Sequence, residues 1–283
     1  MTANEIVRKI QHIAPASEAA LKLVTLLDRS AINNDEIVKV LKYDSVLTAK
    51  LLRGCNSSFY GFNEPVASVE QAVLVLGHRP ILRIVFAIAF NSTMSAPLHT
   101  YAAEANELWR HSLVVALTCE TLAESGLALQ SEPSVAFTAG LLHDIGKVAL
   151  NPVIGEDAQT AIRTRIKEGG KSSVEAEMEV LGTDHAHVGS CLLQSWKLPE
   201  EIVEAVGNHH HPLCKPKPRL SALVNAADVL AYRTGPGLNW ESFVAALDPN
   251  VVDALKLTPE KFKELLTPLN RSLAQVDHLS KMS

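Results

Sequence analysis

The sequence predicts an all-α protein built as two helical lobes. Apolar residues recur at helical spacing along most of the 283 residues, and the alternation that is typical of strands is nearly absent. Polar capping residues, glycines and prolines divide this pattern into separate segments. The clearest break lies at residues 94–99, around Pro97. We therefore expect an N-terminal lobe over residues 1–97 and a second multi-helix lobe over residues 98–283.

The same signals predict the individual helices. In the N-terminal lobe they are expected at residues 16–29, 35–42, 44–55, 68–77 and 80–92. In the second lobe they are expected at residues 100–125, 132–149, 155–171, 175–181, 184–197, 199–208, 219–233, 240–246, 249–256 and 259–279. Asp184 should cap its helix, and Gly189 would let that helix approach another backbone closely. The proline-rich stretch at 212–218 should be a loop.

The composition excludes several classes of protein. Hydrophobic residues make up 47% and charged residues 20%, as in a folded globular chain, and the net charge of −5 with no basic stripe predicts no nucleic-acid partner. No apolar run reaches the roughly 18 residues of a membrane span, and the N-terminus lacks the pattern of a signal peptide, so a cytoplasmic location is expected. Cys55, Cys119, Cys191 and Cys214 form no C-x-x-C pair and are expected to be reduced.

The pair His143–Asp144 is the strongest functional signal. It ends the apolar or small-residue run from Ala136 to Leu142, so it should lie on the floor of a cavity. An unpaired charge in such a place is costly, and a bound cation would remove that cost. Imidazole nitrogen and carboxylate oxygen are both good ligands for divalent metals. We therefore interpret this pair as two adjacent metal ligands.

Other candidate ligands follow in the second lobe, all at helix ends or on apolar helix faces. They are His111, His185, His209, His210 and Asp228. Each has an ordinary explanation when taken alone: a core histidine for His111, a surface or capping residue for His185, a solvated loop for the consecutive histidines, or a salt bridge for Asp228.

Together the candidates are chemically coherent. His111, His143, Asp144 and Asp228 could hold one metal, and His185, His209 and His210 a second, with Asp144 bridging. Two metals about 3.5–4 Å apart are a known arrangement for phosphate-ester hydrolysis. Iron, manganese, zinc and nickel all suit such ligands. Imidazoles must be neutral to bind metal, so occupancy should fall as the pH drops through about 6.

Lys147 and Asp144 are the candidate catalytic residues. Lys147 lies one helical turn past His143, where its ammonium group could contact a substrate phosphate. The alternative is that Lys147 complements the dipole at the C-terminal end of its helix.

These residues resemble the HD superfamily of metal-dependent phosphohydrolases, and most closely the HDOD family of bacterial signalling domains. The resemblance spans residues 10–230 and rests on Leu51 to Gly61 (LLRGCNSSFYG), Val69 to Gly77, Trp109 to Ser112, Leu142 to Lys147 (LHDIGK), Asp184 to Gly189 and Leu198 to Val203. It implies a two-lobed all-α fold with an HD-type metal core in the C-terminal lobe and a role in signal transduction.

The related HD-GYP phosphodiesterases add a detail about the site. By that likeness His111, His143, Asp144, His185, His209, His210 and Asp228 are the metal ligands, and Glu107, one turn before His111, matches the extra carboxylate that holds a third metal in some members. The Gly-Tyr-Pro element that should follow the paired histidines is absent. The chain reads His211-Pro212-Leu213-Cys214-Lys215-Pro216 instead.

Two functions of different classes remain open from the sequence. The first is a phosphodiesterase-like, metal-dependent phosphohydrolase that acts on a nucleotide or phosphodiester. The alternative is a catalytically inactive signalling module whose metal is structural and whose N-terminal lobe presents a groove to a signalling protein. A third, nucleic-acid binding by His78, Arg79 and Arg83, is disfavoured by the acidic net charge.

Overall fold

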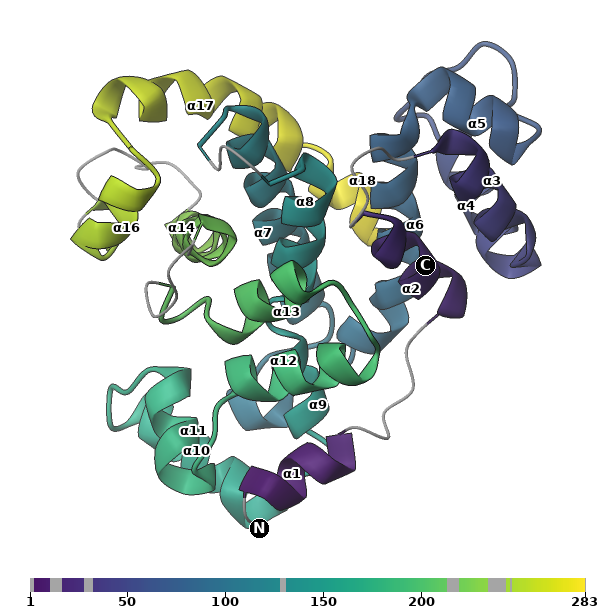
Figure 1. The fold of residues 1–283 in the computed structure, drawn as a ribbon. Helices are drawn as coiled ribbons and strands as arrows, with labels where there is room; N and C mark the ends of the chain where they lie inside the picture. Colours follow the sequence, from purple (N-terminus) through teal and green to yellow (C-terminus); the bar gives the residue numbers. More distant parts are fainter. Residues whose placement is uncertain are drawn as a thin grey trace.

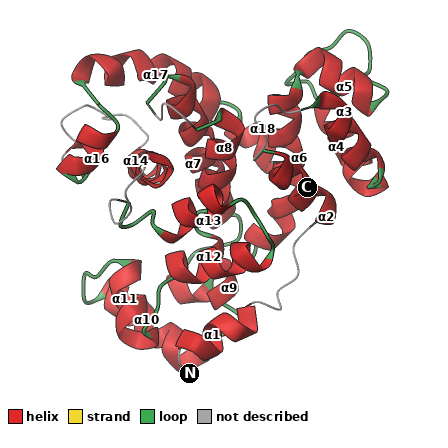
Figure 2. Ribbon diagram, in the orientation of Figure 1, coloured by secondary structure: helices red, strands yellow, loops and turns green. Residues whose placement is uncertain are grey.

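The protein is all-α, as predicted, in a computed structural model that describes residues 3–10, 17–27, 33–127, 131–212, 219–233, 243–244 and 246–282. Within these ranges no strand forms, and one isolated bridge joins Leu98 to Ala103 (Figures 1 and 2). No helix among the described residues is long and apolar enough to cross a membrane.

The N-terminal lobe packs four short helices around one long buried helix. The short helices are α2 (Glu18–Leu26), α3 (Asn34–Lys42), α4 (Ser45–Cys55) and α5 (Val69–Leu76), and the long one is α6 (His78–Met94). Side chains of Ser17, Asn33, Asp44 and Ser68 accept hydrogen bonds from backbone N–H groups at the starts of the four short helices. Phe86 and Phe90 of α6 are fully buried, so this helix forms the centre of the lobe.

The second lobe is built on a central pair, α7 (Glu107–Glu124) and α8 (Pro133–Leu142), crossed by α14 (Arg219–Arg233). The other helices are α9 (Ile145–Leu150), α10 (Glu156–Lys167), α11 (Ser173–Leu181), α12 (His185–Ser195), α13 (Glu200–Gly207), α16 (Pro249–Ala254), α17 (Pro259–Leu273) and α18 (Val276–Ser280), with a short 3₁₀ helix at His99–Tyr101. Trp109 and Phe137 are the largest buried side chains of the central pair.

The two ends of the chain lie away from their neighbours in sequence. The first helix, α1 (Ala3–Ile10), was not expected from the sequence, and it packs on α12 and α9 of the second lobe through Ile6 and Ile10. The last helix, α18, packs on α6 and α7, so the C-terminus lies beside the N-terminal lobe (Figure 1). The predicted lobe boundary at residue 97 therefore stays a prediction. The first helix packs on the second lobe and the last helix packs on the N-terminal lobe, so each end of the chain contacts the lobe to which it does not belong in sequence.

Three predicted helices differ most clearly from the structure, and the helix expected at 240–246 lies mostly outside the described residues. The helix expected at 100–125 begins only at Glu107, because Ala102 and Asn106 adopt left-handed backbone angles (φ 52° and 68°) that end helical geometry. The helix expected at 259–279 divides into α17 and α18. The helix expected at 132–149 is interrupted at His143–Asp144, because Asp144 has φ −99° and ψ 11°, outside the helical region.

Two glycines bring α9 and α12 into direct backbone contact. A Cβ on Gly146 would lie 1.9 Å from the carbonyl oxygen of His185, and one on Gly189 would lie 3.2 Å from the Gly146 nitrogen. The close approach predicted for Gly189 is confirmed, as is the cap by Asp184, whose side chain accepts from the backbone of His187 at 2.8 Å. This contact places Asp144, at the start of α9, beside His185, at the start of α12.

Candidate metal centre

The break between α8 and α9 places two buried polar side chains in the middle of the second lobe. His143 is fully buried and Asp144 is 1% exposed. The Oδ1 atom of Asp144 lies 3.2 Å from His185 Nε2 and 3.9 Å from His209 Nε2, and its Oδ2 atom lies 3.4 Å from His143 Nε2. The two oxygens of one carboxylate thus face different groups of histidines, which is the arrangement that a bridging ligand needs.

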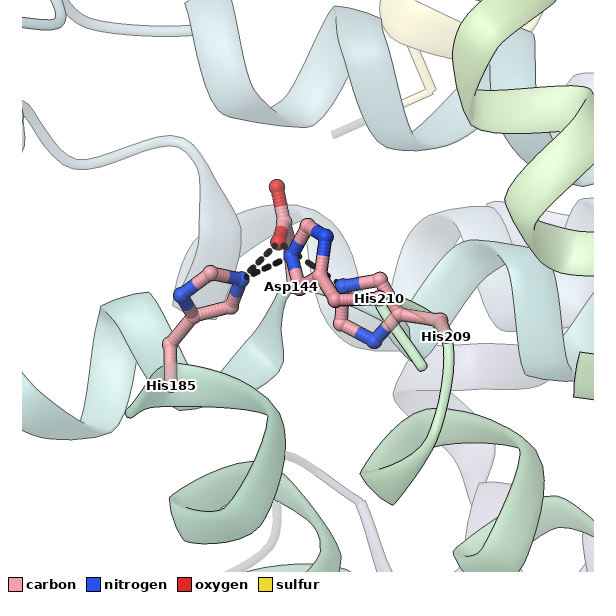
Figure 3. Close-up of side chains that lie close together, drawn as sticks. All are labelled: Asp144, His185, His209 and His210. Carbon is pink, nitrogen blue, oxygen red and sulfur yellow. Dashed lines mark hydrogen bonds and ion pairs between the residues drawn. The ribbon is translucent and has the colours of Figure 1, made fainter. Parts of the chain in front are cut away.

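The first group consists of Asp144, His185, His209 and His210 (Figure 3). One ligand atom from each lies within 4.8 Å of the others. His210 Nε2 is 2.9 Å from His185 Nε2, and the figure shows the rings converging on the carboxylate of Asp144 from α12 and from the end of α13. These are the residues that the sequence assigned to a second metal.

The second group consists of His111, His143 and Asp144, with ligand atoms again within 4.8 Å of one another. Asp228 of α14 joins it, since its Oδ1 atom lies 2.9 Å from His111 Nε2 and 3.6 Å from His143 Nε2. All seven ligands predicted from the sequence are therefore close together, carried by α7, the α8–α9 turn, α12, the end of α13 and α14. Whether they bind metal stays a prediction.

Hydrogen bonds at the far side of three rings fix their orientation. The Nδ1 atoms of His143, His185 and His209 lie 2.8, 2.8 and 2.6 Å from the Gly140 carbonyl, the Glu177 carboxylate and the Val206 carbonyl, respectively. Each of these partners is an acceptor, so each Nδ1 carries the proton. In the neutral rings the lone pairs are then on Nε2, the atoms that point toward Asp144.

Several atoms that face the shared space are buried and make no well-aligned hydrogen bond among the described residues, although His111 Nε2 and Asp228 Oδ1 lie 2.9 Å apart. They are His111 Nε2, His143 Nε2, Asp144 Oδ1, His209 Nε2 and Asp228 Oδ1. A buried polar atom without a partner costs about 1–3 kcal/mol. A cation placed among them would be a common partner for all, and a set of imidazole nitrogens and carboxylate oxygens suits a divalent transition metal. The residues present therefore fit the metal that the sequence predicts.

Burial and charge act differently on the histidines. Burial lowers the pKa of His209 well below its usual value and that of His210 to about 4, so both rings are neutral and able to bind metal at pH 7. Burial also lowers the pKa of His143, but the carboxylates of Asp144 and Asp228 outweigh it and raise this pKa to about 10. His143 therefore holds a proton until a metal displaces it.

Lys147 contacts the shared carboxylate directly. Its Nζ atom donates to Asp144 Oδ2 at 2.6 Å and lies 5.7 Å from the centre of the Tyr101 ring. Burial opposes the charge on Lys147, but Asp144 raises its pKa, so the side chain stays protonated. The interaction orients Asp144 and balances part of the negative charge of the site. Contact of Lys147 with a substrate phosphate stays a prediction.

Glu107 lies outside both groups of ligands. Its side chain is exposed and accepts a hydrogen bond from the backbone N–H of Glu104 at 2.8 Å, as a residue at a helix start often does. The role of Glu107 as ligand of a third metal stays a prediction.

Sequence reasoning missed Glu177, which is fully buried on α11. Its carboxylate accepts hydrogen bonds from the backbone N–H of His185 at 2.6 Å, from His185 Nδ1 at 2.8 Å and from the Tyr101 hydroxyl at 2.7 Å. A signal was present, because Glu177 falls between Val174 and Leu181 on the apolar stripe of its helix.

The two arginines considered for nucleic-acid binding are paired with glutamates. Arg79 lies 3.2 Å from Glu124 and 3.4 Å from Glu132, and Arg83 lies 2.7 Å from Glu120. Cys55, Cys119 and Cys191 are free thiols. Cys214 and the rest of the expected loop after Pro212, at residues 213–218, lie outside the described residues.

Comparison with known proteins identifies relatives of this chain in sequence and in structure. The sequence profile of the HDOD domain matches residues 13–212. An HDOD domain protein of unknown function from Geobacter sulfurreducens is 24% identical, with 97% of each chain covered and a TM-score of 0.77. A candidate phosphohydrolase from Shewanella amazonensis SB2B is 23% identical, with 98% of this chain and 97% of that one covered and a TM-score of 0.74.

Curated relatives share a smaller part of their length. An uncharacterised protein of Treponema pallidum is 22% identical over 238 residues, which are 82% of this chain and 45% of that protein. Ribonuclease Y of Lawsonia intracellularis is 29% identical over 186 residues, which are 63% of this chain and 28% of that enzyme. The chain thus spans less than half the length of these relatives. By its sequence match and its helical fold, this chain belongs to the HDOD domain family.

Proposed function

We propose that this HDOD protein is a metal-dependent phosphohydrolase that acts on a nucleotide or another phosphodiester. The single observation that supports it best is the convergence of the Nε2 atoms of His143, His185 and His209 on Asp144, with each ring fixed by a hydrogen bond at Nδ1. Three separate helix segments bring these rings to one carboxylate.

The proposed centre holds two divalent metal ions. His111, His143, Asp144 and Asp228 would hold one ion, and Asp144, His185, His209 and His210 the other. When bound, such ions act as Lewis acids on phosphoryl oxygens and supply an activated water. The chain contributes orientation: Glu177 holds the His185 ring, and Lys147 holds Asp144.

Access is proposed from the side of α7 and α14. The side chains of His111 and Asp228 are 17% and 14% exposed, whereas those of His143 and His185 are at most 1% exposed. Tyr232, whose ring centre is 4.8 Å from that of His111, is 70% exposed and stands at the edge of the site. A substrate phosphate would therefore meet the His111 half of the centre first.

The test starts with protein purified without an affinity tag. Its metal content is measured by mass spectrometry, followed by hydrolysis assays on mononucleotides, cyclic dinucleotides and an RNA oligonucleotide, the last because some relatives are named ribonuclease Y. We expect one or two ions per chain and turnover on at least one substrate. His185→Ala should lose both metal and turnover. His187→Ala, at an exposed histidine of the same helix, is the matched control. Full metal content without turnover on any substrate would contradict the proposed enzyme activity and leave a structural role for the metal.

A second candidate function, a signalling module with a structural metal, is favoured by the surface of the N-terminal lobe. Tyr43, Val46 and Leu74 are 84%, 66% and 84% exposed on the mutually packed α3, α4 and α5. Exposed large apolar side chains on helices that pack together suit a protein partner. A large fall in melting temperature on chelation, with no turnover on any phosphoester, would favour this module over the enzyme.

A further inference from the structure

A second cavity lies between the N-terminal lobe and the last residues of the chain, and none of its lining residues is a candidate metal ligand. A cavity of about 530 Å³ opens where α18 and the end of α17 meet α4 and α6. Ligand cavities of small molecules are typically about 300–1,000 Å³. The segment Leu51 to Gly61, which the metal centre does not use, supplies Arg53, Ser57 and Phe59 to its wall.

The charge of the cavity wall is positive. Lys50 and Arg53 of α4 lie on one side, and Lys281, after α18, lies on the other. Asp277 is the single carboxylate among the lining residues, and it pairs with Arg110 of α7 at 2.5 Å. Three cationic groups around a cavity favour a ligand with a phosphate group.

A flat aromatic surface lies beside these cations. The ring of Phe59 is stacked on that of His278, with centres 4.4 Å apart and planes 11° apart, and it is perpendicular to the ring of Tyr60, with centres 5.1 Å apart. Phe59 is nevertheless 45% exposed, so part of the ring is open to a ligand. Burial lowers the pKa of His278, which keeps its ring neutral at pH 7. Stacking of a base on an aromatic side chain is worth about 1–3 kcal/mol.

We propose that this cavity binds a mononucleotide, with its phosphate at Lys50, Arg53 and Lys281 and its base on Phe59. The cations alone would suit any small anion, and the aromatic ring alone would suit any flat apolar group. Their combination across one cavity of this size matches a molecule that carries both. Ser57 and Ser58 add hydroxyl groups for the sugar or the phosphate.

The test measures binding by calorimetry with adenosine 5′-monophosphate as the probe, in the presence of a chelator so that the metal centre cannot hold the phosphate. Adenosine and inorganic phosphate, measured separately, each report one half of the site. We expect each half to bind about tenfold more weakly than the nucleotide, or worse. The double variant Lys50→Ala/Lys281→Ala should weaken the nucleotide by a similar factor and leave adenosine unchanged. Phe59→Ala should weaken adenosine and leave phosphate unchanged.

The control is Lys256→Ala/Lys263→Ala, which removes the same charge from exposed positions on another part of the surface. It should bind like the parent, and melting temperatures check that every variant is folded. Several results would overturn the proposal: no binding of the nucleotide, equal affinity in all variants, or phosphate alone binding as tightly as the nucleotide. Loss of binding in Asp144→Asn would place the nucleotide at the metal centre instead.

Discussion

Two buried clusters of ionisable groups in this protein are organised in opposite ways. Where α6 meets α7, the guanidinium of Arg83 faces the carboxylate of Glu120 at 2.7 Å, and Arg83 also donates to Gln275 at 3.1 Å. In the candidate metal centre, imidazole nitrogens and carboxylate oxygens converge on one space without a charged donor for each, and two of the rings are hydrogen-bonded to each other, His185 Nε2 to His210 Nε2 at 2.9 Å. Opposite charges in a cluster neutralise each other without any bound ion. Lone pairs that converge on one space repel one another unless a cation or a proton lies among them.

Burial has an equally different outcome in the two clusters. It raises the pKa of Glu120 to about 7, because the attraction of Arg83 offsets only part of the cost of burying the charge. It lowers the pKa of His210 to about 4, which leaves that ring neutral. The same physical effect thus weakens an ion pair in one region and prepares metal ligands in the other.

The largest expected effect is a difference in bound metal when one carboxylate in each cluster is replaced by its amide. Asp144→Asn removes the charge that both groups of ligands share, so we expect nearly all bound metal to be lost. Glu120→Gln also removes a buried carboxylate charge, but at the paired cluster, and should keep the metal content of the parent. Elemental analysis of both variants after identical purification measures this. Equal metal content in the two variants would refute a bridging role for Asp144.

The pH dependence of metal affinity should reveal the second largest effect, which belongs to the candidate metal centre alone. The pKa of His143 is raised to about 10 by Asp144 and Asp228, so below that pH a metal must displace a proton. Affinity should then rise with pH by up to about tenfold per unit for one proton, or about 100-fold from pH 6 to pH 8. Calorimetry in two buffers of different ionisation enthalpy counts the released protons. An affinity that is constant over this range would contradict the scheme.

Glu177 offers a smaller effect within the metal centre. Glu177→Gln replaces an acceptor that holds both His185 Nδ1 and the His185 backbone N–H, so the ring loses its fixed orientation. Loss of such a supporting residue typically reduces metal affinity by about 10–100-fold. Competition with a chelator of known affinity measures it. Glu175→Gln, at an exposed glutamate of the same helix, is the control and should leave metal affinity unchanged.

The paired cluster should show its effect in stability alone, with metal binding unchanged. The pKa of Glu120 is about 7 when folded, above the usual value of a carboxyl group, so the folded state binds its proton more tightly. The stability from this group is complete below about pH 4.5 and is lost as the pH rises through 7, by about 3 kcal/mol in total. Urea unfolding of chelated parent and Glu120→Gln at pH 5 and pH 8 should show this loss in the parent only. An equal loss of stability in the parent and in Glu120→Gln would show that another group causes it.

Most of the fold could be predicted because apolar periodicity and capping residues act locally. The helix break at Asp144 could not be predicted in this way, because the buried residues on both sides of it leave the apolar pattern continuous. The helix α1 escaped this reasoning, and so did the division of the helix expected at 259–279, because α1 and α18 pack on helices far away in sequence. Local patterns carry no information about such partners.

The candidate site divides in the same way. His143, Asp144 and Asp228 could be found because polar residues in apolar segments are conspicuous. Glu177 lies among other glutamates on a helix with a polar face, and only its position on the apolar stripe marked it. The cavity next to Phe59 could not be foreseen, since α18 closes it from more than 200 residues further along the chain.

The central claim is that convergent lone pairs around Asp144 form a two-metal centre. Its most direct test is an anomalous difference map from crystals of tag-free protein, recorded on both sides of the manganese, iron, nickel and zinc absorption edges. We predict two peaks, one beside His143 and Asp228 and one beside His185 and His210, with Asp144 between them. A map without peaks at these positions, with the Nε2 atoms bonded only to water, would contradict the claim.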